Sequence, residues 1–230
     1  MSCWSCQSAA GEGASCSSCG AIQPPEAGAD HFRVLGVPAK YAIDLAATEA
    51  RFREASRAVH PDRFATADPR ARRFATGRAV QLNEAWRTLK DPVKRAEYLL
   101  SRSGFDVGGE AGAFRPGVDG GAKEKMVVPP ALLGEILDLR EELAAARAAG
   151  NDAHVQKLAR DVRARMSAVM ERVASGFERA GSEAKGSTDE LRALEIVTHD
   201  LIEIRYLRRF LDEVEAHDEA TAQEGGPGLA

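Results

Sequence analysis

The four cysteines are the residues whose spacing most directly predicts chemistry. They form two Cys-x-x-Cys pairs, Cys3 with Cys6 and Cys16 with Cys19, and the rest of the 230-residue chain contains no cysteine. In a reducing compartment such clustering favours metal over disulfides. Each pair supplies two thiolates, and two pairs complete the four-sulfur shell that structural zinc prefers. Residues 1–25 are therefore predicted to form a closed zinc-binding module.

The composition of this module bears on how it would fold. Nine residues separate Cys6 from Cys16, fewer than in common zinc fingers, but Gly11 and Gly13 permit a tight loop. Because the segment has too few apolar residues for its own core, metal binding, typically worth on the order of 10 kcal/mol, would fold it. A thiol-disulfide pair and rubredoxin-like iron stay open as alternatives.

The tripeptide His60-Pro61-Asp62 is the second candidate. Pro61 fixes one backbone angle, so His60 and Asp62 would project from a stiff corner. A catalytic pair is a poor interpretation, because no nucleophile, metal pair or glycine-rich phosphate loop completes an active site, and we expect no enzyme. The remaining choice is between a recognition tip and an ordinary solvated loop, and the surrounding elements decide it.

Two long helices are predicted to flank this tripeptide. The first starts at the N-cap Asp44 and ends before Pro61. Its apolar stripe comprises Leu45, Thr48, Phe52, Ala55 and Val59. We expect its other side to carry Arg51, Arg53 and Arg57, a positive field that would steer an acidic partner.

The second helix starts at Asp68-Pro69, with proline at the first helical position, and runs to about Leu89. Asp91-Pro92 repeats this signal and opens a shorter helix. With a short apolar segment at 30–37, these elements predict a helical domain over residues 30–103. The glycine-rich interval 104–128 reads as a linker, and no strand is expected anywhere.

Three amphipathic helices are predicted after Pro129-Pro130. The third begins at a capping box, Ser187-x-x-Glu190. Their apolar positions are Leu132, Leu133, Ile136, Leu137, Leu139 and Leu143, then Val155 to Phe177, then Leu191 to Val214. Short turns between such helices predict an antiparallel three-helix bundle over residues 129–217, with a disordered tail at 218–230.

Charge and hydropathy exclude several classes of function. A formal charge of -4 gives no global attraction to nucleic acid or to a membrane, and residues 1–29 contain no Lys or Arg. A zinc-ribbon nucleic-acid binder is therefore an unfavoured alternative. Every apolar run is interrupted by charges before it could span a membrane. The N-terminus shows no export or organelle signal, so we expect a cytoplasmic location.

The predicted helical part of the sequence resembles the J-domain family, and in particular its HscB (Jac) branch. The resemblance covers most of residues 30–215. It rests on Phe32-x-x-Leu35-Gly36, His60-Pro61-Asp62-Arg63-Phe64, Asn83-Glu84-Ala85-Trp86, Arg95-Ala96-Glu97-Tyr98-Leu99-Leu100 and Leu137-Asp138-Leu139-Arg140-Glu141-Glu142-Leu143. The segments Cys3-Trp4-x-Cys6 and Cys19 to Pro25 look like the cysteine-bearing extension of eukaryotic mitochondrial members.

The resemblance implies two binding surfaces. One would dock on the ATPase domain of a DnaK-type chaperone, where the aspartate, Asp62, contacts an arginine. Its residues would be His60, Pro61, Asp62, Arg51, Arg53, Arg57 and Arg63. The other would bind the iron-sulfur scaffold protein through Leu133, Leu137, Asp138, Glu141 and Tyr206. Gly134 and Ala145 depart from the family pattern there, and the leucines could instead belong to the core.

These expectations combine into one prediction. The fold is all-α, an L formed by a J-domain hairpin and a three-helix bundle, with a small N-terminal metal knuckle. The function implied is that of a co-chaperone that stimulates a DnaK/HscA-type ATPase and delivers the iron-sulfur scaffold to it. The alternative is a general protein-folding J-protein whose zinc module helps to hold unfolded clients.

Overall fold

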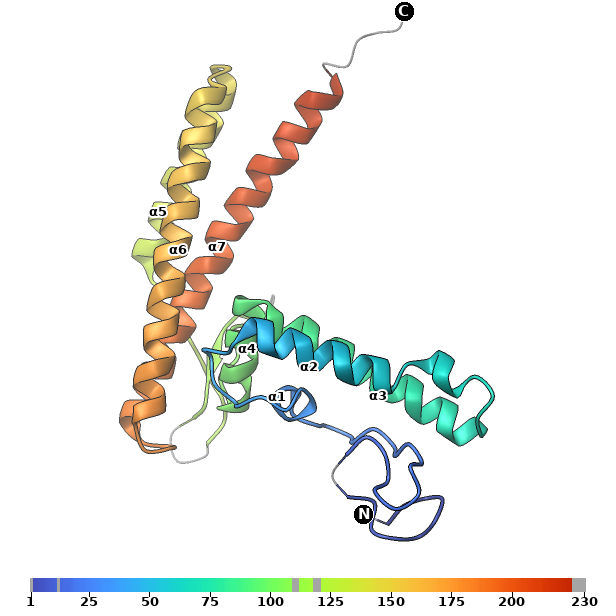
Figure 1. Cartoon of the computed structure of the whole chain (residues 1–230). Coiled ribbons are helices and arrows are strands. Elements are labelled where there is room, and N and C mark those ends of the chain that lie inside the picture. The colour runs from blue at the N-terminus through green and yellow to red at the C-terminus, as the bar shows by residue number, and fades with distance from the viewer. Residues whose placement is uncertain (1, 12, 109–111, 118–120, 225–230) are drawn as a thin grey trace, which may run out of the picture. The chain divides into compact units, whose positions relative to one another are not determined.

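A computed structural model describes residues 2–11, 13–108, 112–117 and 121–224, with side chains up to residue 216 (Figure 1). The backbone contacts divide the chain between Leu99 and Leu100 into two compact units. The L-shaped arrangement of the two units stays a prediction. Within the described ranges, no helix is long and apolar enough to cross a membrane.

The first unit is built on two helices packed side by side (Figure 1). They are α2 (Leu45–Ala58) and α3 (Pro69–Lys90), joined through the short 3-10 helix η1 (Pro61–Phe64). The predicted caps are confirmed: Asp44 accepts from the N–H of Ala47, and Asp68 accepts from the N–H of Arg70. Each cap satisfies one of the backbone donors that a helix start leaves without an intrahelical partner.

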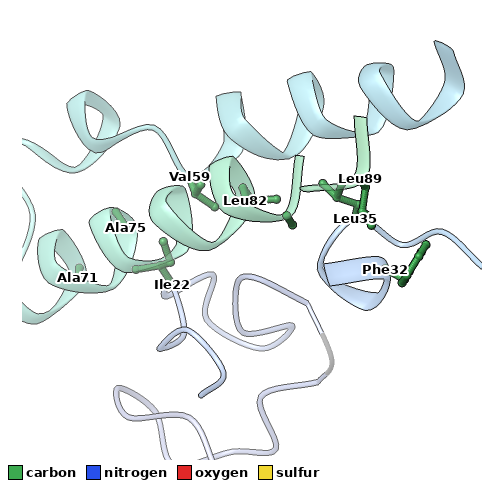
Figure 2. Close-up of a cluster of buried hydrophobic side chains, with 9 residues drawn as sticks. Ile22, Phe32, Leu35, Val59, Ala71, Ala75, Leu82 and Leu89 are labelled. Atoms are coloured by element: carbon green, nitrogen blue, oxygen red, sulfur yellow. The ribbon is translucent and has the colours of Figure 1, made fainter. Parts of the chain in front are cut away.

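Buried side chains from α3, from α1 (His31–Val34) and from the segments just after α1 and α2 form most of the core of this unit (Figure 2). The cluster comprises Ile22, Phe32, Leu35, Val59, Ala71, Ala75, Leu82, Ala85 and Leu89. The predicted stripe of α2 is wrong at one end, since Leu45 is 45% exposed. Leu45 is the first residue of α2, and burial on this stripe starts a turn later at Thr48.

α4 (Pro92–Arg102) begins in the first unit, where its Tyr98 hydroxyl donates to the carboxylate of Asp30 over 3.0 Å. The following interval, predicted as a linker, contains a small antiparallel ribbon. Its strands are β1 (Phe114–Arg115) and β2 (Glu124–Lys125). The expectation of no strand is wrong here, because strands of two residues are too short to show a period-two pattern. This interval also buries Phe105, Val107, Ala113 and Met126.

Three helices make up most of the second unit (Figure 1). They are α5 (Pro130–Ala148), α6 (Asp152–Ser182) and α7 (Thr188–Glu224). The predicted capping box is present, with the N–H of Glu190 donating to Ser187 Oγ over 3.1 Å. α7 extends into the predicted tail as far as Glu224, since alanine and glutamate favour helix there. Residues 225–230 of that tail lie outside the described residues.

Candidate metal centre and recognition surfaces

The first cysteine pair sits in a tight turn closed by its own backbone. The N–H of Gln7 donates to the carbonyl of Cys3 over 3.0 Å, and the N–H of Ser5 points to Cys3 Sγ at 3.4 Å. Gln7 has a φ of 63°, and no other non-glycine residue in the described parts of the chain has a positive φ. The turn therefore holds a strained residue directly after Cys6.

The second pair repeats this turn. The N–H of Gly20 donates to the carbonyl of Cys16 over 2.9 Å, and the N–H of Ser18 points to Cys16 Sγ at 3.4 Å. Gly20 has a φ of 74° directly after Cys19, where glycine adopts that backbone without strain. The two turns, which we call knuckles, thus have the same backbone hydrogen bonds, and each presents two sulfur atoms.

The four sulfurs converge. All four Sγ atoms lie within 4.8 Å of one another, and the pairs Cys3–Cys19 and Cys6–Cys16 are both 3.7 Å apart. Cys3 and Cys16 are buried, whereas Cys6 and Cys19 are exposed. Four convergent thiols with backbone N–H groups directed at two of them suit a bound metal ion, because thiolates are metal ligands and those donors offset negative charge.

The thiols of Cys3 and Cys19 differ in pKa because their surroundings differ. The backbone N–H of Cys6, with further N–H donors from Ser5 and Gln23, lowers the pKa of Cys3 to about 6. The N–H of Ala21 acts in the same direction on Cys19, yet the neighbouring thiols and burial raise the pKa of Cys19 to about 11. Four thiolates this close repel one another, and a divalent cation would remove that repulsion.

Gln23 is a residue of this centre to which sequence reasoning assigned no role. Its buried side-chain amide donates to Cys3 Sγ over 3.3 Å and to the carbonyl of Ala21 over 2.7 Å. A glutamine four residues after the last cysteine was the available signal. Its contact depends on the folded turn, which spacing alone does not specify.

The His60-Pro61-Asp62 tripeptide lies at the end of the hairpin where α2 passes into η1. The side chain of His60 is 57% exposed and that of Asp62 is 90% exposed. The backbone N–H of Asp62 donates to His60 Nδ1 over 3.3 Å, which orients the imidazole. The structure thus presents an almost fully accessible carboxylate on a short, fixed turn.

Arginines near this tripeptide do not all share one face. Arg53 and Arg57 lie about 140° and 180° around α2 from the buried Thr48, so both point outward. Arg63 folds back, and its guanidinium donates to the carbonyl of Arg57 over 3.3 Å. These three side chains are exposed near the tripeptide, and the guanidinium of Arg53 is paired with the carboxylate of Glu49 over 2.5 Å.

Arg51 differs from the expected arrangement. It lies about 60° from Thr48 around the helix, beside the buried stripe rather than opposite it. Its exposed guanidinium donates to the carbonyl of Gly36 over 2.9 Å, at the end of the segment that follows α1. The outer face of α2 therefore carries Arg53 and Arg57 without Arg51.

One edge of α5 exposes two large apolar side chains. Leu137 is 59% exposed and Leu133 is 38% exposed, so neither belongs to the core. Asp138 and Glu141 are also exposed, and they continue this surface around the helix. The buried positions of α5 are Leu132, Ile136, Leu143 and Ala146. The apolar and acidic residues therefore share a solvent-facing side.

Tyr206 is half-buried on α7, and the register of α5 with α7 sets its level relative to α5. The two helices run in the same direction, and Arg140 of α5 pairs with Glu213 of α7 over 2.6 Å. Leu133 and Tyr206 each lie seven residues before a member of this pair, hence about 10.5 Å along either helix. Arg147 of α5 also donates to the carbonyl of Glu213 over 2.6 Å, so Tyr206 lies about level with the stretch of α5 from Leu133 to Arg140. We define the partner face as Leu133, Leu137, Asp138, Glu141 and Tyr206.

Comparison with known families gives two matches. The DnaJ domain matches residues 30–98, and the HSCB C-terminal oligomerisation domain matches residues 128–215. The first match contains the tripeptide and the second contains the partner face.

Curated relatives agree with these matches. A protein named co-chaperone protein HscB homolog from Burkholderia multivorans (strain ATCC 17616 / 249) is 38% identical over 158 residues, which cover 67% of this chain and 83% of that protein. One of the same name from Vibrio vulnificus (strain YJ016) is 38% identical over 114 residues, covering 50% of this chain and 59% of that protein.

Solved structures show the same fold. The crystal structure of human co-chaperone protein HscB matches with a TM-score of 0.75 and 23% identity, covering 95% of this chain and 98% of the human one. Chaperone HscB from Vibrio cholerae matches with a TM-score of 0.64 and 25% identity, covering 84% and 99%. The matches to both domains and the identity to the Burkholderia protein show that this chain belongs to the HscB family of J-domain co-chaperones.

Proposed function

We propose that this protein stimulates ATP hydrolysis by a DnaK/HscA-type chaperone and delivers an iron-sulfur scaffold protein to it. The observation that carries the proposal is the exposed Asp62 carboxylate on the fixed turn after α2, in a chain of the HscB family. ATP would bind to the partner chaperone, and this chain would act by contact. A cytoplasmic setting suits the proposal, because thiols stay reduced there.

The chaperone contact would rest on charge. Asp62 would pair with an arginine of the partner, and Arg53, Arg57 and Arg63 would face its acidic groups. Arg51, held on the carbonyl of Gly36, would contribute to the fold of the first unit more than to this contact. Such complementary surfaces mainly raise the rate of association and fix orientation.

The scaffold contact would use the partner face. Exposed Leu133 and Leu137 offer apolar area that is buried only when a partner binds, worth roughly 25 cal/mol for each Å² covered. Asp138 and Glu141 would restrict the partner to one with basic groups nearby. The departures at Gly134 and Ala145 leave less apolar and acidic surface along α5 than the family pattern has.

For the cysteines, we propose zinc, held by Cys3, Cys6, Cys16 and Cys19. A four-sulfur shell without an open position gives zinc a structural role, in which it cross-links the two knuckles. Metal analysis of the purified protein should find one zinc per chain, and the four thiols should react with a thiol reagent only after chelation. Iron in its place, or freely reactive thiols without chelator, would contradict this assignment.

The central proposal is tested by steady-state ATPase measurements with the cognate chaperone. Asp62→Asn, which keeps the size of the side chain and removes its charge, should abolish most of the stimulation. Asp106→Asn, at an exposed carboxylate in the second unit, serves as the control. Full stimulation by Asp62→Asn would refute the proposal.

Competition between denatured proteins and the scaffold distinguishes a general protein-folding role from the dedicated role. If denatured proteins displace the scaffold from this chain and stimulate the ATPase equally well, the general role is the better description. If only the scaffold does so, the dedicated role holds.

A further inference from the structure

Gln23 touches the metal centre on one side and α3 on the other. Its side-chain amide donates to Cys3 Sγ, and its backbone carbonyl accepts from Arg78 Nε of α3 over 2.7 Å. Arg78 also donates to the carbonyl of Pro24 over 3.1 Å. The chain leaving the second knuckle is therefore bound to α3 directly beside a ligand sulfur.

Trp4 makes a second connection. It follows the ligand Cys3, and its indole N–H donates to the carbonyl of Ile22 over 2.6 Å. Its ring meets the edge of Phe74 on α3, with centroids 5.9 Å apart and planes at 77°. An aromatic pair in this geometry contributes about 0.5–1.5 kcal/mol beyond the area it buries.

The same segment closes part of the core. Ile22 is 1% exposed and belongs to the cluster that includes Ala71 and Ala75 of α3 (Figure 2). Pro25 lies so close to Gly77 that a Cβ at Gly77 would be 2.9 Å from Pro25 Cγ. Residues 22–25 are thus packed against α3, with Ile22 and Gln23 buried.

These contacts make the two parts depend on each other. Without a metal ion, little besides backbone hydrogen bonds holds the knuckles, since their buried core consists of Cys3, Ala10 and Cys16. If the knuckles open, Gln23, Trp4 and Ile22 lose their fixed positions on α3. Conversely, a folded α3 holds Gln23 in place to donate to the sulfur.

We propose that metal binding by the four cysteines is thermodynamically coupled to the folding of the α2–α3 hairpin, with Gln23 and Arg78 as the positioning residues that transmit the coupling. The inference rests on the metal centre proposed above. By linkage, a metal that binds the folded state stabilises the hairpin, and a change in α3 that loosens Gln23 weakens the metal. The cysteine module is then part of the J-domain's stability.

The tryptophans allow this to be measured in the full chain. The sequence has two, Trp4 and Trp86, and Trp86 stacks on Phe52 across α2 and α3. In a Trp4→Phe background, which loses the indole bond to Ile22 but keeps the contacts of Gln23 and Arg78, the fluorescence of Trp86 alone reports hairpin unfolding. Zinc should raise the melting midpoint by at least about 5 °C relative to chelated protein. An equal midpoint with and without zinc, under conditions where metal is bound, would overturn the coupling.

Substitutions of two arginines of α3 test whether Arg78 transmits the coupling between metal binding and hairpin folding. Arg78→Met removes the donors to residues 23 and 24 without touching a cysteine, whereas Arg73→Met changes an exposed arginine of the same helix. Arg78→Met should reduce the zinc-dependent shift by half or more, and Arg73→Met should keep it. Equal shifts in both variants would contradict the role of Arg78.

Cobalt(II), followed by its thiolate absorption, supplies the reciprocal readout. Gln23→Ala should weaken cobalt binding by about tenfold or more, as loss of a partner to a ligand typically does. Arg78→Met should weaken it in the same direction, and Gln23→Glu, which cannot donate, should not restore it. If the unmodified protein shows no cobalt-thiolate band, the metal centre itself fails. If the unmodified protein shows the band and Arg78→Met binds cobalt with unchanged affinity, the metal centre stands and only the proposed coupling is refuted.

Discussion

The rings of Phe52 and Trp86 stack between α2 and α3, with centroids 5.4 Å apart and planes 13° from parallel. Both are half-buried, so their contact joins the two helices near the surface as well as in the core. The exposed tripeptide depends on this hairpin, because η1 is held between the same two helices. The stability of the pair is therefore a requirement for the recognition turn.

Phe52→Ala should lower the free energy of unfolding of the first unit by about 2–3 kcal/mol, below the usual cost for a fully buried phenylalanine. Urea denaturation followed by Trp86 fluorescence in the Trp4→Phe background measures this. Val80→Ala on the exposed side of α3, where Val80 is 58% exposed, should change stability by less than about 0.5 kcal/mol. Equal effects of the two substitutions would show that the stack contributes no stability.

Two glycines of α6 should respond oppositely to alanine. A Cβ at Gly176 would lie 2.4 Å from Val197 Cγ2 of α7, whereas a Cβ at Gly181 would meet nothing within 4 Å. Gly181→Ala should stabilise the bundle by roughly 0.5–1 kcal/mol through helix propensity. Gly176→Ala should destabilise it by about 1–3 kcal/mol, because the helices must move apart.

Thermal unfolding followed by circular dichroism checks both glycine variants. A gain in stability for Gly176→Ala would mean that α6 and α7 pack less closely at this crossing than the structure has them.

Asp200 of α7 should make the second unit less stable as the pH rises. It is 7% exposed, its Oδ1 accepts from Arg172 Nε over 3.0 Å, and no hydrogen bond to its Oδ2 is found within the described residues. Burial raises its pKa above the ordinary 3.8, although Arg172 opposes the shift. Between 3.8 and the raised value the folded state holds more protons than the unfolded state, so stability falls with rising pH.

Asp200→Asn should therefore gain stability relative to the unmodified protein as the pH rises above 3.8, because the amide keeps the acceptor and loses the charge. Urea denaturation at several pH values measures this difference. Asp212→Asn, at an exposed carboxylate of the same helix, should show no such trend. A difference that is independent of pH would refute the assignment.

Scaffold binding should depend on an exposed leucine of the partner face but not on an exposed leucine outside it. Leu137→Ala and Tyr206→Ala should each weaken scaffold binding by about tenfold or more, the loss of an interface residue worth over 1 kcal/mol. Leu191→Ala, at a leucine 36% exposed on α7 outside the partner face, is the matched control. Calorimetric titration with the scaffold measures all three, and equal affinities would exclude the partner face as the binding site.

Local signals predicted most of the helices of this fold. Asp44, Asp68 and the Ser187–Glu190 box act on backbone groups within one turn, so the sequence alone places them. The paired cysteines likewise define a knuckle through neighbouring residues. The family resemblance, carried by motifs around the tripeptide and on α5, correctly indicated the HscB family.

What could not be predicted depends on contacts between distant residues. Leu132 and Leu133 are adjacent and alike, and only the position of α6 and α7 decides that one is buried and the other exposed. Helical periodicity alone places Arg51 beside the buried stripe of α2, but its contact with the carbonyl of Gly36 joins two segments that are distant in the sequence. The contacts of Gln23 with Cys3 and Arg78 join three segments, which no local pattern contains.

The repeated knuckle has a consequence for how this module can vary over evolution. Each turn closes on its own hydrogen bonds, Gln7 to Cys3 and Gly20 to Cys16, independently of the residues between the turns. The carbonyls of Ala10 and Ala14 accept from the N–H groups of Ser17 and Gln23, so only insertions between Ala10 and Ala14 would leave these contacts in place. Such an insertion would lengthen a loop at a cost that grows only slowly with its length. The number of residues between the pairs can thus change at little cost, whereas the two residues inside each pair cannot.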